Sequence, residues 1–135
     1  MRLSPYLHFN GQCEAAFKFY ERCLGGKITC LATYEGSPMA DQAPPEWRRK
    51  IMHATLLLGG AELMGCDPPP GCYEPPKGFS VTLNPDNLAD AERLFNALAE
   101  NGKVSLPLQK TFWSAGFGML VDQFGIPWMI NCGQT

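Results

Sequence analysis

The sequence lacks an excess of charge of either sign, long apolar runs and an apolar N-terminal segment. Its 135 residues include 11 Lys and Arg and 13 Asp and Glu, a formal net charge of −2. This balance leaves no positive surplus with which to hold a nucleic acid or an anionic membrane. The longest apolar run lies around Ala54–Leu58 and is far too short to cross a bilayer. The first residues, "MRLSPYLHF", have neither the apolar region nor the cleavage site of a signal peptide. We therefore expect a cytoplasmic protein without a nucleic-acid or membrane partner.

Motifs of several common enzyme classes are also missing. The stretches "LGGK" and "LLGG" lack the spacing of a phosphate-binding loop, and there is no G-x-S-x-G sequence. The six cysteines show neither C-x-x-C nor zinc-ribbon spacing. In a reducing compartment we expect most of them to be small buried apolar side chains. Histidine is scarce, since His8 and His53 are the only two.

What the sequence does contain is enough apolar residues for a core and two segments with helical spacing. At 45% hydrophobic residues the chain can fold as one domain, residues 1–135. In each segment the apolar residues recur on one side of a helix, and a stop signal follows, at Gly25–Gly26 and at Asn101–Gly102. The first stripe contains Ala16, Phe19, Tyr20 and Cys23, and the second contains Leu88, Ala91, Leu94, Phe95 and Leu98.

The two segments belong to a longer internal repeat. Each follows a short apolar strand, at Tyr6–Phe9 and at Phe79–Leu83, and three further strand-like runs follow each helix. Matching residues in the two halves lie about 75 residues apart, the size of a duplicated supersecondary unit. The matches are Asn10, Tyr20, Gly26, Lys27 and Ile28 with Asn84, Phe95, Gly102, Lys103 and Val104.

This repeat predicts an α+β fold made of two β-α-β-β-β modules. The first module covers about residues 1–66, and the second covers about 78–135. Residues 67–77 form a proline-rich and therefore stiff connection. A second irregular stretch, residues 35–50, interrupts the first module and has the length of a functional loop.

Four segments give the chain a resemblance to a known family. They read "PYLHFNGQCEAAFKFYERCLGGKI", "PPEWRRKIMHATLLLGGAELMGCD", "GFSVTLN" and "AERLFNALAENGKVSLPLQKTFWSAGFGMLVDQFGIPWMIN". Together they resemble PhnB-like proteins of the vicinal-oxygen-chelate superfamily, which includes glyoxalase I, bleomycin-resistance proteins and extradiol dioxygenases. The resemblance implies paired βαβββ modules with curved mixed sheets around a concave cavity, and a homodimer. Some PhnB-like proteins carry a methyltransferase name, but the sequence has no Gly-rich loop after a first strand to hold a nucleoside cofactor.

Enzymes of this superfamily hold a divalent metal through His, Gln or Glu at four strand positions, so the resemblance allows each position to be checked. The last position falls on Met129, whose soft, uncharged thioether is a poor ligand for such ions. The position that opens the second half falls on Phe79 or Ser80, and the one on the first strand falls within Leu3–Tyr6. Only Glu62 offers a credible ligand. We therefore expect no tightly held metal and no other cofactor.

Most candidate ligand-binding residues are placed toward the cavity by strand alternation or by the resemblance, and Trp113 is a candidate because glycine and small residues surround it. His8 shares a strand face with Tyr6, and His53 shares one with Ile51 and Thr55. The candidates have alternative interpretations. A histidine in a strand can be a hydrogen-bonded structural residue, and Glu62 can be a solvated carboxylate in a hairpin. The aromatic residues can pack in the core or in a dimer. The candidates are Tyr6, His8, His53, Glu62, Trp113 and Met129.

Three functions remain open at this point. The first is a protein that binds a small, partly aromatic or amphipathic molecule without a catalytic metal. The second is a metal-dependent lyase, isomerase or dioxygenase that uses His8, His53 and Glu62. The third is a dimeric structural or interaction protein whose cavity is filled by its own side chains. Whether the chain is an enzyme at all does not follow from the fold.

Overall fold

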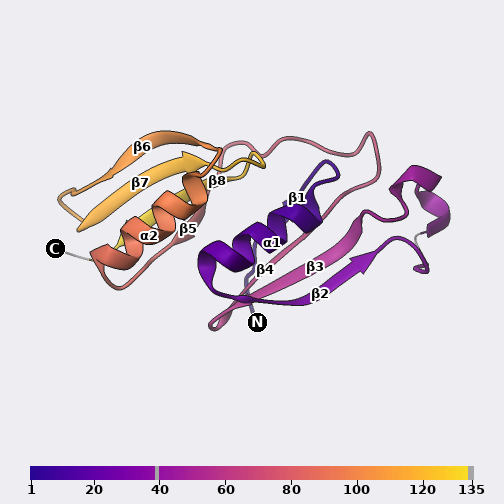
Figure 1. Ribbon diagram of the computed structural model, residues 1–135, viewed down its shortest axis with the longest axis horizontal. Coiled ribbons are helices and arrows are strands. Elements are labelled where there is room, and N and C mark those ends of the chain that lie inside the picture. The colour runs from indigo at the N-terminus through magenta and orange to yellow at the C-terminus, as the bar shows by residue number, and fades with distance from the viewer. Residues whose placement is uncertain (39, 134–135) are drawn as a thin grey trace. The chain divides into compact units, whose positions relative to one another are not determined.

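The computed structural model describes residues 1–38 and 40–133, apart from the side chain of Gln42. The chain forms two compact units, Met1–Pro75 and Pro76–Thr135. Each unit pairs one α-helix with one four-stranded sheet (Figure 1). The division falls inside the proline-rich connection.

The first unit is a βαβββ module. Its strands are β1 (Tyr6–His8), β2 (Lys27–Thr33), β3 (Ile51–Leu58) and β4 (Ala61–Cys66), and its helix is α1 (Cys13–Leu24). The sheet order is β1-β4-β3-β2, with β1 parallel to β4 and the other pairs antiparallel. Two short 3₁₀ helices, η1 (Ala40–Gln42) and η2 (Pro45–Trp47), lie in the irregular stretch before β3.

The second unit repeats the same order of elements. Its strands are β5 (Val81–Leu83), β6 (Lys103–Gln109), β7 (Gly116–Val121) and β8 (Pro127–Cys132), and its helix is α2 (Leu88–Ala99). The sheet order is β5-β8-β7-β6, and β5 alone runs parallel to its neighbour. The prediction of an α+β fold with two βαβββ modules is confirmed.

Local hydrogen bonds mark the end of α1 and the start of α2. The backbone N–H of Gly25, at φ 75°, donates to the carbonyl of Glu21 and closes α1. The side chain of Asn87 accepts from the backbone N–H of Asp90 and caps the start of α2. The expected apolar stripe of α2 is one residue too long, because Leu88 is 44% exposed. Leu88 packs against Gly116, since a methyl group on Gly116 would lie 2.8 Å from the Leu88 side chain. Because glycine has no side chain, it leaves Leu88 partly uncovered.

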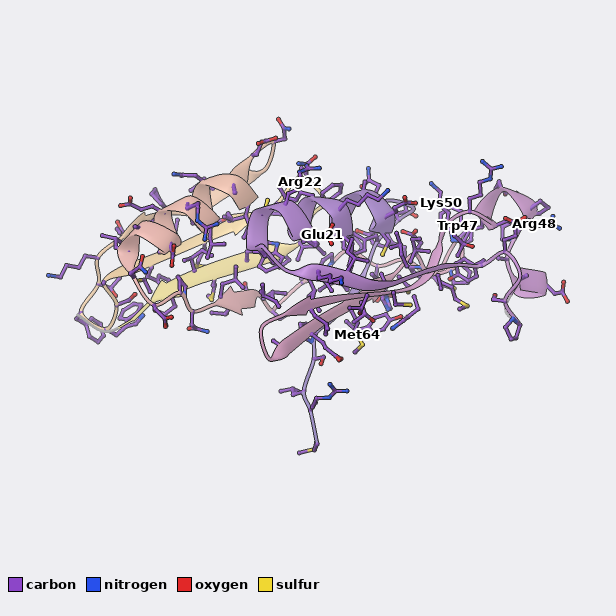
Figure 2. The ribbon with its side chains drawn as sticks, turned by 60° about the horizontal axis from the view of Figure 1, so that its bottom comes forward. Glu21, Arg22, Trp47, Arg48, Lys50 and Met64 are labelled. Carbon is purple, nitrogen blue, oxygen red and sulfur yellow. The ribbon has the colours of Figure 1, made fainter. Side chains whose placement is uncertain are left out.

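Strand register decides which side chains meet the helix. In the first sheet, Leu7, Gly65 and Ala54 stand in one row across β1, β4 and β3, and all are buried. The next row along β1, Tyr6, Met64 and Thr55, points to the other side. Figure 2 shows Met64 on the side of the sheet away from α1. We call this side, in either sheet, the open face.

The second sheet divides its side chains in the same way. Leu120 and Trp128 are paired across β7 and β8 and are buried against α2, as are Gly118 and Ile130. The open face carries the alternating residues, and its pairs include Met119 with Met129 and Phe117 with Asn131.

One expected alternation fails at the start of β3. Ile51 was expected to share the face of His53, but it is 1% exposed and belongs to the core. The register between β2 and β3 shifts between Ala32 and Thr33, and this irregularity reverses the side on which the first residues of β3 lie.

A buried carboxylate joins the parts of the first unit. Asp67 directly follows β4 and is 1% exposed. Its Oδ1 accepts the backbone N–H groups of Gly11 and Cys13 at 2.9 and 3.0 Å, and its Oδ2 accepts that of Ile51 at 3.0 Å. The Tyr34 hydroxyl donates to the Asp67 carbonyl at 2.6 Å, and burial raises the pKa of Tyr34 to about 12, which keeps it protonated. Asp67 therefore connects the starts of α1 and β3 to the end of β4.

The second unit places a buried carboxylate at a different turn. Asp122 follows β7, and its Oδ1 accepts the backbone N–H groups of Phe124 and Ile126. Its Oδ2 accepts the indole N–H of Trp128 at 2.8 Å. This carboxylate orders the turn into β8 and fixes the buried tryptophan at the start of that strand.

No helix in residues 1–38 and 40–133 is long and apolar enough to cross a membrane. All six cysteines lie within these ranges and are free thiols. Cys13, Cys23, Cys66 and Cys132 are buried, Cys30 is half-buried, and Cys72 is exposed.

We expect Asp67→Ala to lower the free energy of unfolding by about 3 kcal/mol, because three backbone N–H donors lose their acceptor. Urea denaturation measures this change. Asp41→Ala removes an exposed carboxylate from η1 and is the matched control, with little expected effect. Equal stability of the two variants would show that Asp67 does not connect these elements.

Gly26 and Gly102 occupy equivalent places in the two modules. A methyl group on either would lie 2.4 Å from a backbone carbonyl oxygen, that of Leu57 or of Val121. We expect Gly26→Ala and Gly102→Ala each to cost about 1–3 kcal/mol of stability by overpacking. Gly60→Ala is the control, because no atom lies within 4 Å of its added methyl group. Thermal denaturation of the three variants measures these losses. If only one of Gly26→Ala and Gly102→Ala lowers the stability, the two glycines are not equivalent.

Candidate functional site

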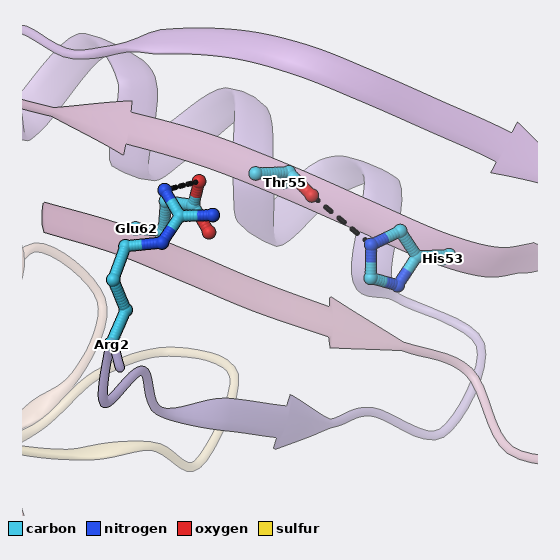
Figure 3. A network of polar contacts seen from close by, with 4 residues as sticks. All are labelled: Arg2, His53, Thr55 and Glu62. Atoms are coloured by element: carbon cyan, nitrogen blue, oxygen red, sulfur yellow. Dashed lines mark hydrogen bonds and ion pairs between the residues drawn. The ribbon is translucent and has the colours of Figure 1, made fainter.

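Three polar side chains form a hydrogen-bonded row on the open face of the first sheet. The Tyr6 hydroxyl lies 3.0 Å from His53 Nδ1, and His53 Nε2 lies 3.1 Å from the Thr55 hydroxyl. Figure 3 shows His53 and Thr55 on the side of the sheet away from α1. The order of the strands brings Tyr6 and His53 together. β1 and β3 both flank β4, so Tyr6 and Thr55 lie opposite Met64 on its two sides.

The hydrogen-bond roles in this row follow from the ionisation of Tyr6. Burial raises the pKa of the Tyr6 hydroxyl above its usual value, and the adjacent Cys66 thiol raises it further. Tyr6 therefore stays protonated at neutral pH and can donate to Nδ1 of a neutral His53. The ring proton of that histidine then lies on Nε2, which donates to Thr55.

His8 joins this group through ring contact. Its ring packs edge-on against Tyr6, with centroids 5.8 Å apart and planes at 88°. The Tyr6 and His53 rings are 5.7 Å apart. His8 is exposed, so the group presents an accessible imidazole beside a hydrogen-bonded one. The structure thus brings together three of the predicted residues, Tyr6, His8 and His53.

Glu62 lies on the same open face but has another partner. It stands opposite Leu57, two residues along β4 from Met64, and its Oε1 lies 3.0 Å from Nη1 of Arg2. Figure 3 shows this ion pair as separate from the pair of His53 and Thr55. The Arg2 side chain is 77% exposed, so the pair contributes little to stability and can open.

The side chains of the first sheet do not fit the divalent metal that the superfamily would imply. Both ring nitrogens of His53 take part in hydrogen bonds, and the carboxylate of Glu62 faces a guanidinium. Across residues 1–38 and 40–133, no group of three His, Cys, Asp or Glu side chains could hold a metal ion. We therefore derive no chemical step through a metal.

The nearby thiols have little nucleophilic character. Burial raises the pKa of the Cys66 thiol, as does Asp67, while a hydrogen bond with Tyr6 acts in the opposite direction. Burial is also the largest cause of the raised pKa of Cys13, followed by Asp67. Both groups therefore remain neutral thiols at physiological pH.

The remaining two predicted residues lie in the second unit. Met129 is on the open face of the second sheet, opposite Thr82 on β5 and Met119 on β7. Trp113 lies in the turn before β7 and contacts the ring of Phe117, with centroids 5.3 Å apart. The six predicted residues are thus divided between two open faces.

Sequence reasoning missed two asparagines beside Trp113. Asn84 directly follows β5, and Asn131 lies in β8 next to Ile130, the partner of Leu83. The Nδ2 of Asn131 lies 3.4 Å from the Oδ1 of Asn84. The available signal was an asparagine at the end of two apolar strands, "VTLN" and "PWMIN", but only the parallel pairing of these strands brings the side chains together.

Lys50 is the last residue of the irregular stretch before β3. Its Nζ donates to the carbonyl of Gly11 at 2.9 Å and lies 6.0 Å from the centre of the Trp47 ring. Figure 2 shows Trp47, Arg48 and Lys50 beside one another in the irregular stretch before β3. This contact fastens that stretch to the loop before α1.

We expect the neutral form of His53 to be the Nε2-protonated tautomer, because Nδ1 accepts from Tyr6 and Nε2 donates to Thr55. Nitrogen-15 spectra of the imidazole distinguish the two forms. Tyr6→Phe removes the donor to Nδ1 and should increase the Nδ1-protonated form of His53. Tyr73→Phe, in the proline-rich connection, is the control and should leave the spectrum unchanged. An Nδ1-protonated ring in the unaltered protein would contradict the proposed roles.

Comparison with known proteins places the chain in a family. The sequence model of the family described as 3-demethylubiquinone-9 3-methyltransferase matches residues 1–131. Protein YjdN of Escherichia coli K12 is 35% identical over 139 residues, which cover 97% of this chain and 95% of YjdN.

Two solved structures extend the likeness. The crystal structure of PA1353 from Pseudomonas aeruginosa is 48% identical, with a TM-score of 0.91 over 100% of this chain and 99% of that one. A PhnB protein from Bacillus cereus shares the fold at 23% identity, with a TM-score of 0.78 over 98% of this chain and 100% of that one. With its two βαβββ modules, the chain belongs to the PhnB-like family, whose model carries the methyltransferase description.

Proposed function

We propose that the protein binds a small, partly aromatic or amphipathic molecule on the open faces of its sheets, without a tightly held catalytic metal. The observation that carries this proposal is the hydrogen-bonded row of Tyr6, His53 and Thr55 on the open face of the first sheet. Most of the buried apolar side chains lie on the opposite face, so this row lies outside the core.

The surroundings of the row suit a ligand with both apolar and polar parts. Met64 and the 38%-exposed Leu57 supply adaptable apolar surface on the same face. The Tyr6 ring is 42% exposed and offers an aromatic surface. Binding sites for small molecules typically combine such apolar lining with a few fixed polar groups.

The donor chemistry supports binding without a metal. A ligand set of His8, His53 and Glu62 would require His53 to give up a hydrogen bond and Glu62 to leave Arg2. The last superfamily ligand position carries the thioether of Met129. A metal-dependent lyase, isomerase or dioxygenase is the alternative, and it would need these rearrangements.

The methyltransferase description of the family does not enter the proposal. A nucleoside methyl donor is commonly held by a Gly-rich loop after a first strand. Here the segment between β1 and α1 contains a single glycine, Gly11, whose backbone is covered by Lys50 and Trp47.

The proposal includes a cytoplasmic location and a homodimer. Six free thiols, most of them buried, suit a reducing compartment. The outer strands of the two sheets are β1 and β2 in one and β5 and β6 in the other, and their edges are surfaces on which a second copy could pair. The third function considered, a structural protein with a filled cavity, would bind no small molecule.

The test combines a thermal-shift screen with metal analysis. We expect at least one small aromatic compound or organophosphonate to stabilise the protein, by about 2.7 kcal/mol at a hundredfold its dissociation constant. Tyr6→Phe should weaken that compound severalfold, as loss of one hydrogen bond implies. Tyr73→Phe, outside both sheets, should bind like the unaltered protein.

Two outcomes would contradict the proposal. If no compound stabilises the protein, the open faces do not bind small molecules of this kind. If protein purified without chelators holds stoichiometric nickel, zinc, manganese or iron, and Glu62→Ala loses it, the metal-dependent alternative is correct.

A further inference from the structure

The second unit contains a cavity at one end of its open face. Its volume is about 430 Å³, enough for a small organic molecule. It lies where β5 and β8 end and where the turn before β7 passes them. Its lining residues are Asn84, Pro85, Asp86, Trp113, Asn131 and Gly133.

An unused hydrogen-bond acceptor lies at this cavity. The Oδ1 of Asn131 is buried and makes no hydrogen bond. The other amide atom, Nδ2, reaches Asn84 only at 3.4 Å, the long limit of a hydrogen bond. Leaving a buried polar group unpaired costs about 1–3 kcal/mol. A rotation of the Asn131 amide toward the cavity would lose little and would let a ligand N–H pair with its oxygen.

The aromatic wall of the cavity is held in place. Ser114, next to Trp113, is fully buried, and its hydroxyl lies 2.8 Å from the carbonyl of Cys132. The backbone N–H of Ala115 also donates to this carbonyl, at 3.1 Å. Cys132 follows Asn131 in β8, so the turn that carries Trp113 is tied to the strand that carries the unpaired amide.

The Trp113 ring combines support with exposure. It packs edge-to-face against Phe112 on one side and Phe117 on another, with centroids 4.7 and 5.3 Å apart. It nevertheless remains 42% exposed. A supported and partly open indole is a surface on which a flat or cationic group can stack.

The charge of the lining selects the ligand. Among the lining residues, Asp86 is acidic, Asn84 and Asn131 carry amide groups, and none is basic. Acceptors, a negative charge and an indole together favour a planar cation with several N–H donors. An anion would meet the Asp86 carboxylate without a compensating positive charge.

We propose that this cavity is a binding site for a small planar organic cation of the amidinium or guanidinium class. The cation stacks on Trp113, pairs with the Asp86 carboxylate and donates N–H groups to Asn131 and Asn84. The proposal uses none of Tyr6, His53 or Glu62. Its success or failure is therefore separate from that of the ligand site on the first sheet.

The test uses benzamidinium, with benzamide as a neutral analogue of the same shape and benzoate as an anionic one. Binding is followed by the indole N–H resonances of the three tryptophans and by titration calorimetry. We expect benzamidinium to shift the Trp113 resonance, to bind more tightly than benzamide and to weaken with added salt. Benzoate should not bind.

Matched variants locate the site. Asp86→Asn removes the charge and keeps the shape, and Trp113→Leu removes the stacking surface. Each should weaken benzamidinium about fivefold. Glu100→Gln neutralises an exposed carboxylate elsewhere on the same unit and should leave binding within about twofold. Backbone spectra confirm that each variant is folded, and Asp86→Asn, an exposed position, decides the matter if Trp113→Leu does not fold.

Four results would overturn the proposal. The first is an absence of binding at millimolar benzamidinium. The second is equal binding of benzamidinium, benzamide and benzoate. The third is unchanged affinity in Asp86→Asn. The fourth is a shift confined to the resonances of Trp47 and Trp128.

Discussion

The arrangement of the first unit depends on the buried carboxylate of Asp67. One side chain accepts N–H groups from the loop before α1, from the first residue of α1 and from the first residue of β3. These contacts bring the starts of α1 and β3 to the end of β4. The helix therefore covers one side of the sheet, and the side chains on the opposite side lie outside the core. The candidate site lies on that uncovered side.

The two modules reach the same architecture with different anchors. In the second unit the buried carboxylate is Asp122, which follows β7 rather than the last strand. It accepts hydrogen bonds from two backbone N–H groups of the next turn and from the indole N–H of Trp128. What the modules share is backbone packing: Gly26 and Gly102 both approach a strand carbonyl so closely that a methyl group would not fit. Duplication has thus kept the close contacts of helix, turn and sheet and has changed the polar groups.

The open faces of the two units carry different side chains. The first presents an imidazole bonded on both sides, together with an ion pair at its far end. The second presents paired methionines, and a cavity with an indole and two asparagines at its edge. These surfaces differ in hydrogen-bond capacity and in charge, so we propose that they recognise different chemical groups. The shared fold supplies two platforms, and the side chains on each decide what it can bind.

Much of the fold could be predicted from the sequence, because periodicity and the internal repeat are local properties of the chain. β1 and β5 lie within the predicted ranges Tyr6–Phe9 and Phe79–Leu83. The helix α1 ends directly before its predicted stop signal, and α2 ends two residues before its own. The failures have identifiable causes. Leu88 lies exposed because its neighbour across the interface is Gly116, and Ile51 is turned inward by a register shift. Neither effect leaves a signal in the spacing of apolar residues.

The candidate site was less predictable, because it depends on strand order. Alternation alone assigns Tyr6 to a face, but its contact with His53 requires β1 and β3 to flank β4. The pairing of Asn84 with Asn131 likewise requires β5 to lie beside β8. Such contacts join residues 47 apart in sequence in both cases, and pattern analysis does not reach across that distance.

The most direct test of the central claim, that ligands bind to the open faces, uses the methionine methyl groups. Met64, Met119 and Met129 report on these faces, and Met1, at the exposed N-terminus, reports on non-specific contact. The protein is labelled with carbon-13 at the methionine methyls and titrated with phenylphosphonate, a small aromatic organophosphonate. The account predicts saturable shifts at Met64, Met119 or Met129 while Met1 stays in place. Shifts confined to Met1, or no shift at any methyl group, would contradict it.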